Sequence, residues 1–207
     1  MKAQSQFVSG TTATSTDAKH AGVLFIFVGA VFILLVTLLE SLYPDYSIHS
    51  NTISDLLAVG KETAYLGEPV MFIIAAAWIA GGYYLARHTG KVLLVLNIMP
   101  GTGLLLAVLS PENVNIAIHS VGAVLAFFIS PVVMLLTLRS INTSFRYFTL
   151  ALAITSLSFA VLEFGAYYSS LVQQTFGPGG AERMIIYPIM IWLIGYGSHL
   201  LGKGHQS

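Results

Sequence analysis

The chain has 207 residues, of which 56% are hydrophobic and only 9% are charged, with nine basic and nine acidic side chains. A soluble domain usually has about a quarter charged residues, so this chain cannot cover a water-facing surface and the lipid bilayer is its expected solvent. The absence of a basic excess argues against a nucleic-acid partner, and the absence of cysteine excludes disulfides, thiolate metal ligands and cysteine nucleophiles.

Residues 1–20 are polar and rich in Ser and Thr, and we expect a disordered tail there. A spanning helix needs about 20 mainly apolar residues, and the apolar run after the tail is too long for a signal-peptide core. The stretches that meet the length requirement are 21–42, 65–86, 92–109, 114–138, 147–169 and 181–201. We therefore predict an all-α membrane domain of six transmembrane helices over residues 21–203.

The basic residues predict how this domain is oriented. With six spans both termini lie on one side, and that side holds seven of the nine basic residues. They are Lys2, Lys19, Arg87, Lys91, Arg139, Arg146 and Lys203. The other side holds only Lys61 and Arg183. Since Lys and Arg are enriched in cytoplasmic loops, we predict a multi-pass protein of the cell membrane with both termini in the cytoplasm.

The connection between the first two spans, residues 42–64, is the longest in the chain, and a loop of that length usually has its own structure or a function. Thr52 and Asp55 have capping-box spacing, which predicts a short helix that Gly60 ends. This pattern fits a purely structural element. It also fits a lid on the outer surface, with His49, Ser54 or Asp55 facing inward.

The last span begins after Gly-Pro-Gly-Gly at 177–180, with Glu182 and Arg183 in its first turn. Helix N-termini carry unpaired N–H groups and partial positive charge, which favour an anion such as a phosphate or carboxylate. An ordinary turn is the alternative interpretation of the same residues.

Two ionisable side chains are predicted inside the membrane on the outer side. His119 lies roughly 7–8 Å and Glu163 about 10 Å from the outer ends of their helices, at 1.5 Å per residue. Asn115 shares the face of His119. Such groups face the bundle interior or a wet cavity. Two interpretations stay open: a structural pair of Glu163 with His119 or Arg183, and a polar pocket open to the outside.

Metal and cofactor chemistry is not indicated. The histidines and acidic residues that could bind a metal have no HxxxH or HExxH spacing, so we predict no metal site. The other histidines lie near the cytoplasmic ends, so we expect no haem or other cofactor. Ser54, His119 and an acid can form a catalytic triad only if the fold brings them together.

Three short motifs carry a family resemblance. Asn-Thr-Ile-Ser-Asp-Leu at 51–56 resembles the signature of the membrane-protein family called domain of unknown function 998. Pro111 followed by His119, and the Gly-x-x-Glu-Arg pattern at 179–183, are also similar to that family. The resemblance implies a six-helix prokaryotic membrane protein of unassigned biochemistry. It marks, without known roles, the positions Ile53, Ser54, Asp55, His119, Glu182 and Arg183. The chain does not match the three-histidine pattern of ceramidase-like membrane hydrolases.

We therefore predict a polar site on the outer side that binds or processes a lipid head group or another small anionic ligand. The candidate catalytic residues are His119, Asp55 and Ser54. The candidate ligand-binding residues are Arg183, Glu182, Glu163, Asn51, Asn115 and His49. Membrane lipids are the expected partners, and the sequence does not identify a protein partner.

Whether the protein is an enzyme is open at this point. An enzyme requires that His119, Asp55 and a nucleophile or water converge within hydrogen-bond reach. A transporter or sensor requires a cavity that continues toward the middle of the membrane. A structural accessory subunit requires that Glu163, Glu182 and Arg183 pair with one another and leave no cavity.

Overall fold

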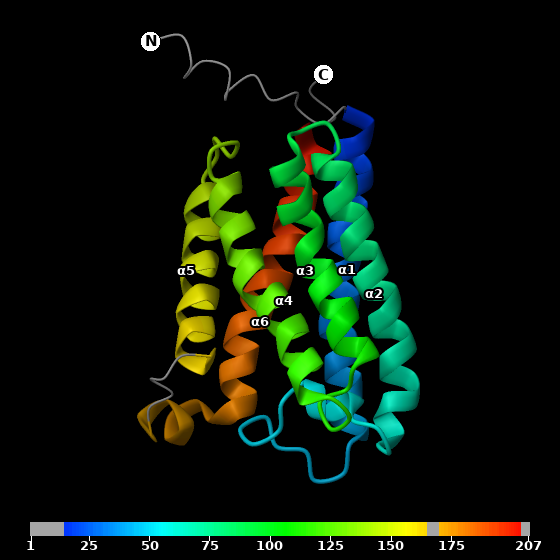
Figure 1. Cartoon of the computed structure of the whole chain (residues 1–207). Coiled ribbons are helices and arrows are strands. Elements are labelled where there is room, and N and C mark those ends of the chain that lie inside the picture. Colours follow the sequence, from blue (N-terminus) through cyan, green and yellow to red (C-terminus); the bar gives the residue numbers. More distant parts are fainter. Residues whose placement is uncertain (1–14, 165–169, 204–207) are drawn as a thin grey trace.

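The structure is a computed structural model that describes residues 15–164 and 170–203. Within these residues all regular structure is helical, as predicted, and Figure 1 shows long helices running side by side. Six helices are long and apolar enough to cross a membrane. They are α1 (Ser15–Leu42), α2 (Glu62–Ala86), α3 (Lys91–Leu109), α4 (Ile116–Thr137), α5 (Phe145–Phe164) and α6 (Ser170–Lys203). A short 3-10 helix, η1 (Ser54–Leu57), lies between α1 and α2.

The helices form a ring in chain order, because each packs against the preceding one and α6 packs against α1. The start of α1 and the end of α6 lie together at one end of the bundle, which we call the terminal end (Figure 1). The opposite end, which we call the loop end, holds residues 43–61, residues 110–115 and the beginning of α6. Helix α5 packs mainly on α4 and α6 and lies at one edge of the bundle.

Glycine allows the closest helix contacts. Gly22 of α1 lies against the backbone of Gly197 in α6, and Gly103 of α3 lies against Gly122 of α4. In lipid, where burial of apolar surface does not drive helices together, small residues stabilise a bundle by letting backbones approach closely. These contacts hold α1 to α6 and α3 to α4 around the interior of the ring.

Helix α1 begins at Ser15, six residues before the predicted start. The prediction of a disordered tail is therefore wrong for residues 15–20, and residues 1–14 lie outside the described residues. The cause is Asp17, which is 1% exposed. Its carboxylate pairs with Arg87 at 2.5 Å and lies 2.9 Å from Nε2 of His88, just after the end of α2. A buried carboxylate needs such partners, and they extend α1 into the polar segment.

The other differences are at the loop end. The described part of α5 ends at Phe164, so the predicted end of the fifth span, at 165–169, lies outside the described residues. Helix α6 begins at Ser170 and not at Ala181, and it is interrupted at Gly177, where φ is 64° and ψ is 174°. Pro178 then occupies the first turn of the main part of the helix, a position that proline favours.

Candidate functional site

A cavity lies inside the ring and extends from the loop end toward the middle of the bundle. Its volume is about 60 Å³, and about 10–15 Å³ is enough to hold one water. Along α4 it extends from His119 to Phe127, eight residues or about 12 Å of helix. Its apolar walls are formed by Phe32, Met71, Trp78, Leu104, Val108, Ala126, Phe127 and Ile186.

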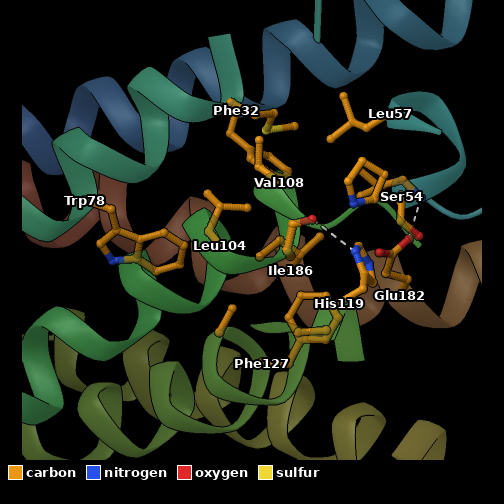
Figure 2. Close-up of a pocket in the computed structure, with 16 residues that line it drawn as sticks. Phe32, Ser54, Leu57, Trp78, Leu104, Val108, His119, Phe127, Glu182 and Ile186 are labelled. Atoms are coloured by element: carbon orange, nitrogen blue, oxygen red, sulfur yellow. Dashed lines mark hydrogen bonds between the residues drawn. The ribbon is translucent and has the colours of Figure 1, made fainter. Parts of the chain in front are cut away.

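The polar groups of the cavity are gathered at the loop end. Figure 2 shows Ser54, His119 and Glu182 together at one end and Trp78 at the other. The Ile53 N–H donates to Oε2 of Glu182, which ties the loop before η1 to α6. Ile53, Ser54 and Leu57 all line the cavity, so η1 and the residue before it cover its polar end. This placement agrees with the lid interpretation for Ser54.

His119 is held by the last turn of α3. Its Nδ1 lies 3.1 Å from the carbonyl oxygen of Ala107 and 3.1 Å from that of Ser110. Carbonyl oxygens only accept hydrogen bonds, so Nδ1 carries the proton and donates it. The terminal carbonyls of a helix lack intrahelical partners, and His119 satisfies two of them here. In the neutral ring, Nε2 is then an unprotonated acceptor.

Ser54 does not form a triad with His119. Its hydroxyl donates to Oε2 of Glu112 at 2.5 Å and lies 2.9 Å from the hydroxyl oxygen of Thr52. Among the described residues, no hydrogen bond joins Ser54 to His119, although both line the cavity. Sequence reasoning missed Glu112 as the partner of Ser54, because the two residues are 58 positions apart.

Asp55 is a capping residue in this structure. The Thr52 N–H donates to Oδ2 of Asp55 at 2.9 Å, and the Asp55 N–H donates to the Thr52 hydroxyl at 3.2 Å. These reciprocal bonds are those of the predicted capping box. Gly60 has the predicted left-handed conformation, with a φ of 92°, but it does not end the short helix as predicted, because η1 ends at Leu57 and Gly60 lies in the turn before α2. Asp55 does not line the cavity, so its placement favours the structural interpretation over the catalytic one.

Changing Asp55 to alanine is expected to lower the free energy of unfolding by about 1 kcal/mol, the usual cost of losing a cap. Asp55→Asn is the control, because its side-chain oxygen can still accept from Thr52, and we expect a smaller loss. Unfolding in mixed micelles measures both. A catalytic role would instead appear as equal losses of activity in the two variants without matching losses of stability.

Arg183 lies at the centre of a second polar cluster, which faces α1 and not the cavity. Its five N–H groups match five hydrogen bonds: two to Oε1 of Glu40, one to the Tyr46 hydroxyl and one each to the carbonyls of Asn51 and Gly179. The ion pair with Glu40 measures 2.7 Å, and the side chains are 6% and 16% exposed. Successive helix residues point about 100° apart, so Glu182 faces the cavity while Arg183 faces α1.

The interpretation of Glu163 as a structural partner of His119 or Arg183 is therefore wrong. Arg183 pairs with Glu40 because α6 packs against α1 at this depth. His119 is engaged by the carbonyls at the end of α3. One carboxylate oxygen of Glu163 is buried without a hydrogen-bond partner among the described residues.

Tyr46 completes the Arg183 cluster. Its hydroxyl accepts from Arg183 and lies 3.2 Å from the carbonyl oxygen of Asn51 and 3.0 Å from that of Thr52, to which it donates. Burial raises the pKa of Tyr46 to about 12, against the opposing effect of the Arg183 guanidinium. The phenol is therefore protonated at neutral pH and can serve as donor and acceptor at once.

The comparisons with known proteins identify a family. A family model described as a protein of unknown function (DUF998) matches residues 26–199. The chain belongs to this family. No curated protein and no solved structure matches the chain.

In this DUF998 protein the remaining candidate residues hold the loop in place. Nε2 of His49 lies 3.3 Å from the carbonyl of Gln174, and the carbonyl of His49 accepts from the Gly179 N–H at 3.2 Å. Asn51 accepts from the Ser47 N–H and donates to Asp55. The helix start after Gly177 is thus covered by the loop and is not an open anion site.

Asn115 caps α4 by accepting from the Ile118 N–H at 3.1 Å, and it is exposed. The described residues contain no group of three or more side chains that could hold a metal ion. Of the predicted site residues, Ser54, His119 and Glu182 line the cavity, whereas Arg183, Asp55, Asn51, His49, Asn115 and Glu163 do not.

Proposed function

We propose that this DUF998 protein binds an amphipathic molecule of the membrane, with an apolar chain in the cavity and a polar head at Ser54, His119 and Glu182. The observation that carries this proposal is the separation of polarity within one cavity. The walls toward Trp78 are apolar, and the polar groups lie only at the loop end. Ligand pockets are typically apolar with a few convergent polar groups that fix orientation.

In this proposal the polar end faces the outside of the cell membrane. At the terminal end, Arg87 and Arg139 lie in the connections, and Lys91 and Arg146 lie in the first turns of α3 and α5. Lys61 and Arg183 lie at the loop end. Basic residues favour the cytoplasm, so this distribution supports cytoplasmic termini and a site at the outer leaflet. The ligand is then a lipid or a lipid-like molecule of that leaflet. The prokaryotic origin that the resemblance implied stays a prediction.

The geometry favours binding over the alternative functions. Hydrolysis by a serine nucleophile is less well supported, because Ser54 donates to Glu112 and not to His119. A transport path is also less well supported, because Trp78 separates the cavity from a second void of only about 10 Å³. An accessory role was expected to pair Glu163, Glu182 and Arg183 with one another and to leave no cavity. It is less well supported, because Arg183 pairs with Glu40 and a cavity is present.

Fluorescence of Trp78 tests the proposal. The chain has two tryptophans, and Trp192→Phe leaves Trp78, which lines the cavity, as the only one. The probe is dodecanol with bromine at its chain end, added to the protein in nanodiscs, because bromine quenches a tryptophan that it contacts. We expect quenching that saturates with the mole fraction of the probe.

The matched variants are Ala123→Leu and Ala117→Leu, both on α4. Ala123 lines the cavity, so leucine there is expected to fill part of it and to weaken the saturable quenching. Ala117 is exposed, and leucine there is expected to change nothing. Quenching that rises linearly, or that is equal in the two variants, would show that the probe reaches Trp78 only from the surrounding lipid and would remove the proposal.

A further inference from the structure

The polar side chains at the loop end of the cavity offer hydrogen-bond acceptors to a ligand. His119 donates through Nδ1 to backbone carbonyls, so the neutral ring offers only a lone pair at Nε2. Within the described residues, nothing else engages Nε2. A ligand that meets this nitrogen must supply a donor.

Ser54 also presents only an acceptor. Its single hydroxyl proton goes to Glu112. Because that proton is already used, the contact between the Thr52 and Ser54 hydroxyls is a donation from Thr52 to Ser54. A hydroxyl oxygen has two lone pairs, and one of them on Ser54 is left for a ligand.

Glu182 adds a carboxylate to this end of the cavity. The side chain lines the cavity although the residue is only 8% exposed, and Oε2 accepts from the Ile53 N–H. No hydrogen bond from the described residues occupies Oε1. Glu112 and Glu163 also act electrostatically on Glu182, so three acidic side chains gather near this end of the cavity.

Arg183 acts on Glu182 electrostatically, but no basic side chain of the described residues forms an ion pair with Glu182 or Glu112. The described ion pairs involve Asp17 and Glu40, and neither Glu182 nor Glu112 takes part in one. Arg183 is adjacent in sequence, but its N–H groups are committed to the cluster that faces α1. A buried carboxylate without a paired cation is costly in lipid surroundings, and a cation brought by a ligand would lower that cost.

We propose that the head group bound here is a protonated amine, whose N–H donors meet Ser54, His119 and Glu182. This inference rests on the proposed function and names the ligand class for the same cavity. An ammonium supplies three donors and a positive charge, which match three acceptors, one of them a carboxylate oxygen. An anionic head would meet like charge and no donor. The described residues lack a cluster of metal-binding side chains, so an organic cation fits better than a metal ion.

The test uses three probes with the same bromine-tipped dodecyl chain and different heads: an amine, an alcohol and a carboxylic acid. Saturable quenching of Trp78 in the Trp192→Phe protein measures the apparent affinity of each. We expect the amine to bind at least about tenfold more tightly than the acid, which corresponds to about 1.4 kcal/mol, with the alcohol between them.

Glu182→Gln is the deciding variant. Glutamine keeps an oxygen that can accept from Ile53 but removes the charge, so the preference for amine over acid should fall to about threefold or less. Glu68→Gln, a partly exposed position on α2 outside the cavity, should leave the preference unchanged. Ser54→Ala should weaken amine and alcohol by a similar factor, because it removes an acceptor and no charge.

The outcomes separate the two proposals. Equal or tighter binding of the acid by the unmodified protein would overturn the amine assignment and leave the proposed function standing. An unchanged preference in Glu182→Gln would also overturn the assignment, because the carboxyl would then act as a neutral group. Absence of saturable quenching by all three probes would instead remove the proposed function.

Discussion

Replacing Arg183 with methionine is expected to lower the free energy of unfolding by about 3–5 kcal/mol, the range seen when one partner of a buried ion pair is removed. The variant leaves Glu40 without its cation, 16% exposed at the end of α1. It also removes the donors to the carbonyls of Asn51 and Gly179. Since Asn51 and Gly179 belong to the loop and to α6, the loss should loosen η1 over the cavity.

Three comparisons identify the cause of this loss. Arg139→Met changes an exposed arginine and should stay within about 0.5 kcal/mol of the parent. Glu40→Met combined with Arg183→Met should recover part of the loss, because neither charge is then left unpaired. Unfolding in mixed micelles gives the free energies. A loss below about 1 kcal/mol for Arg183→Met would mean that the cluster is solvated and does not hold the loop.

The parts of the structure that could be predicted depend on short-range sequence patterns. Six apolar stretches must become helices, because lipid offers no partner for a backbone N–H. The capping box of Thr52 and Asp55 joins residues three positions apart, so its geometry follows from local spacing. The same holds for the break at Gly177, where Gly-Pro-Gly-Gly cannot continue a helix unchanged.

The partners of the polar residues could not be predicted, because they lie far apart in the chain. Arg183 and Glu40 are separated by 143 positions, and the choice of Glu40 over Glu163 depends on which neighbour of α6 lies beside that turn. Glu182 and Arg183 are adjacent in sequence, yet one faces the cavity and the other faces α1. The sequence places both residues in one helical turn. It does not show which neighbouring helix each side chain faces.

The sequence pointed to a polar pocket through His119, but the apolar walls of the cavity had no sequence signal. Phe32, Trp78 and Leu104 are ordinary apolar residues of spanning helices, and nothing in the pattern distinguishes a wall of a cavity from a closed contact. The cavity exists because the residues that five helices and η1 turn inward at this depth do not fill the centre of the ring. That outcome depends on side-chain volumes from the whole bundle and not on any single segment.

Replacing Gly177 with alanine is expected to lower the free energy of unfolding by about 3 kcal/mol and to weaken binding in the cavity. A φ of 64° with a ψ of 174° is a region that essentially only glycine adopts, and occupying it with another residue costs about 1–3 kcal/mol. A β-carbon at this position would also overlap the carbonyl group of His49. The loop must then move, and it carries the backbone groups that contact Arg183 and Glu182.

Gly180→Ala is the matched control, three residues further along the same helix. Its β-carbon would meet only the β-carbon of Phe176, at 3.4 Å, which is an ordinary contact. Alanine is favoured over glycine within a helix by up to about 1 kcal/mol, so this variant should be as stable as the parent or more stable. Unfolding in mixed micelles and saturable quenching of Trp78 measure the two effects. If Gly177→Ala and Gly180→Ala had the same stability and the same quenching, the contact between the loop and the start of α6 would not determine the shape of the cavity. The ligand would then have to be recognised without the loop, through His119 and the apolar walls alone.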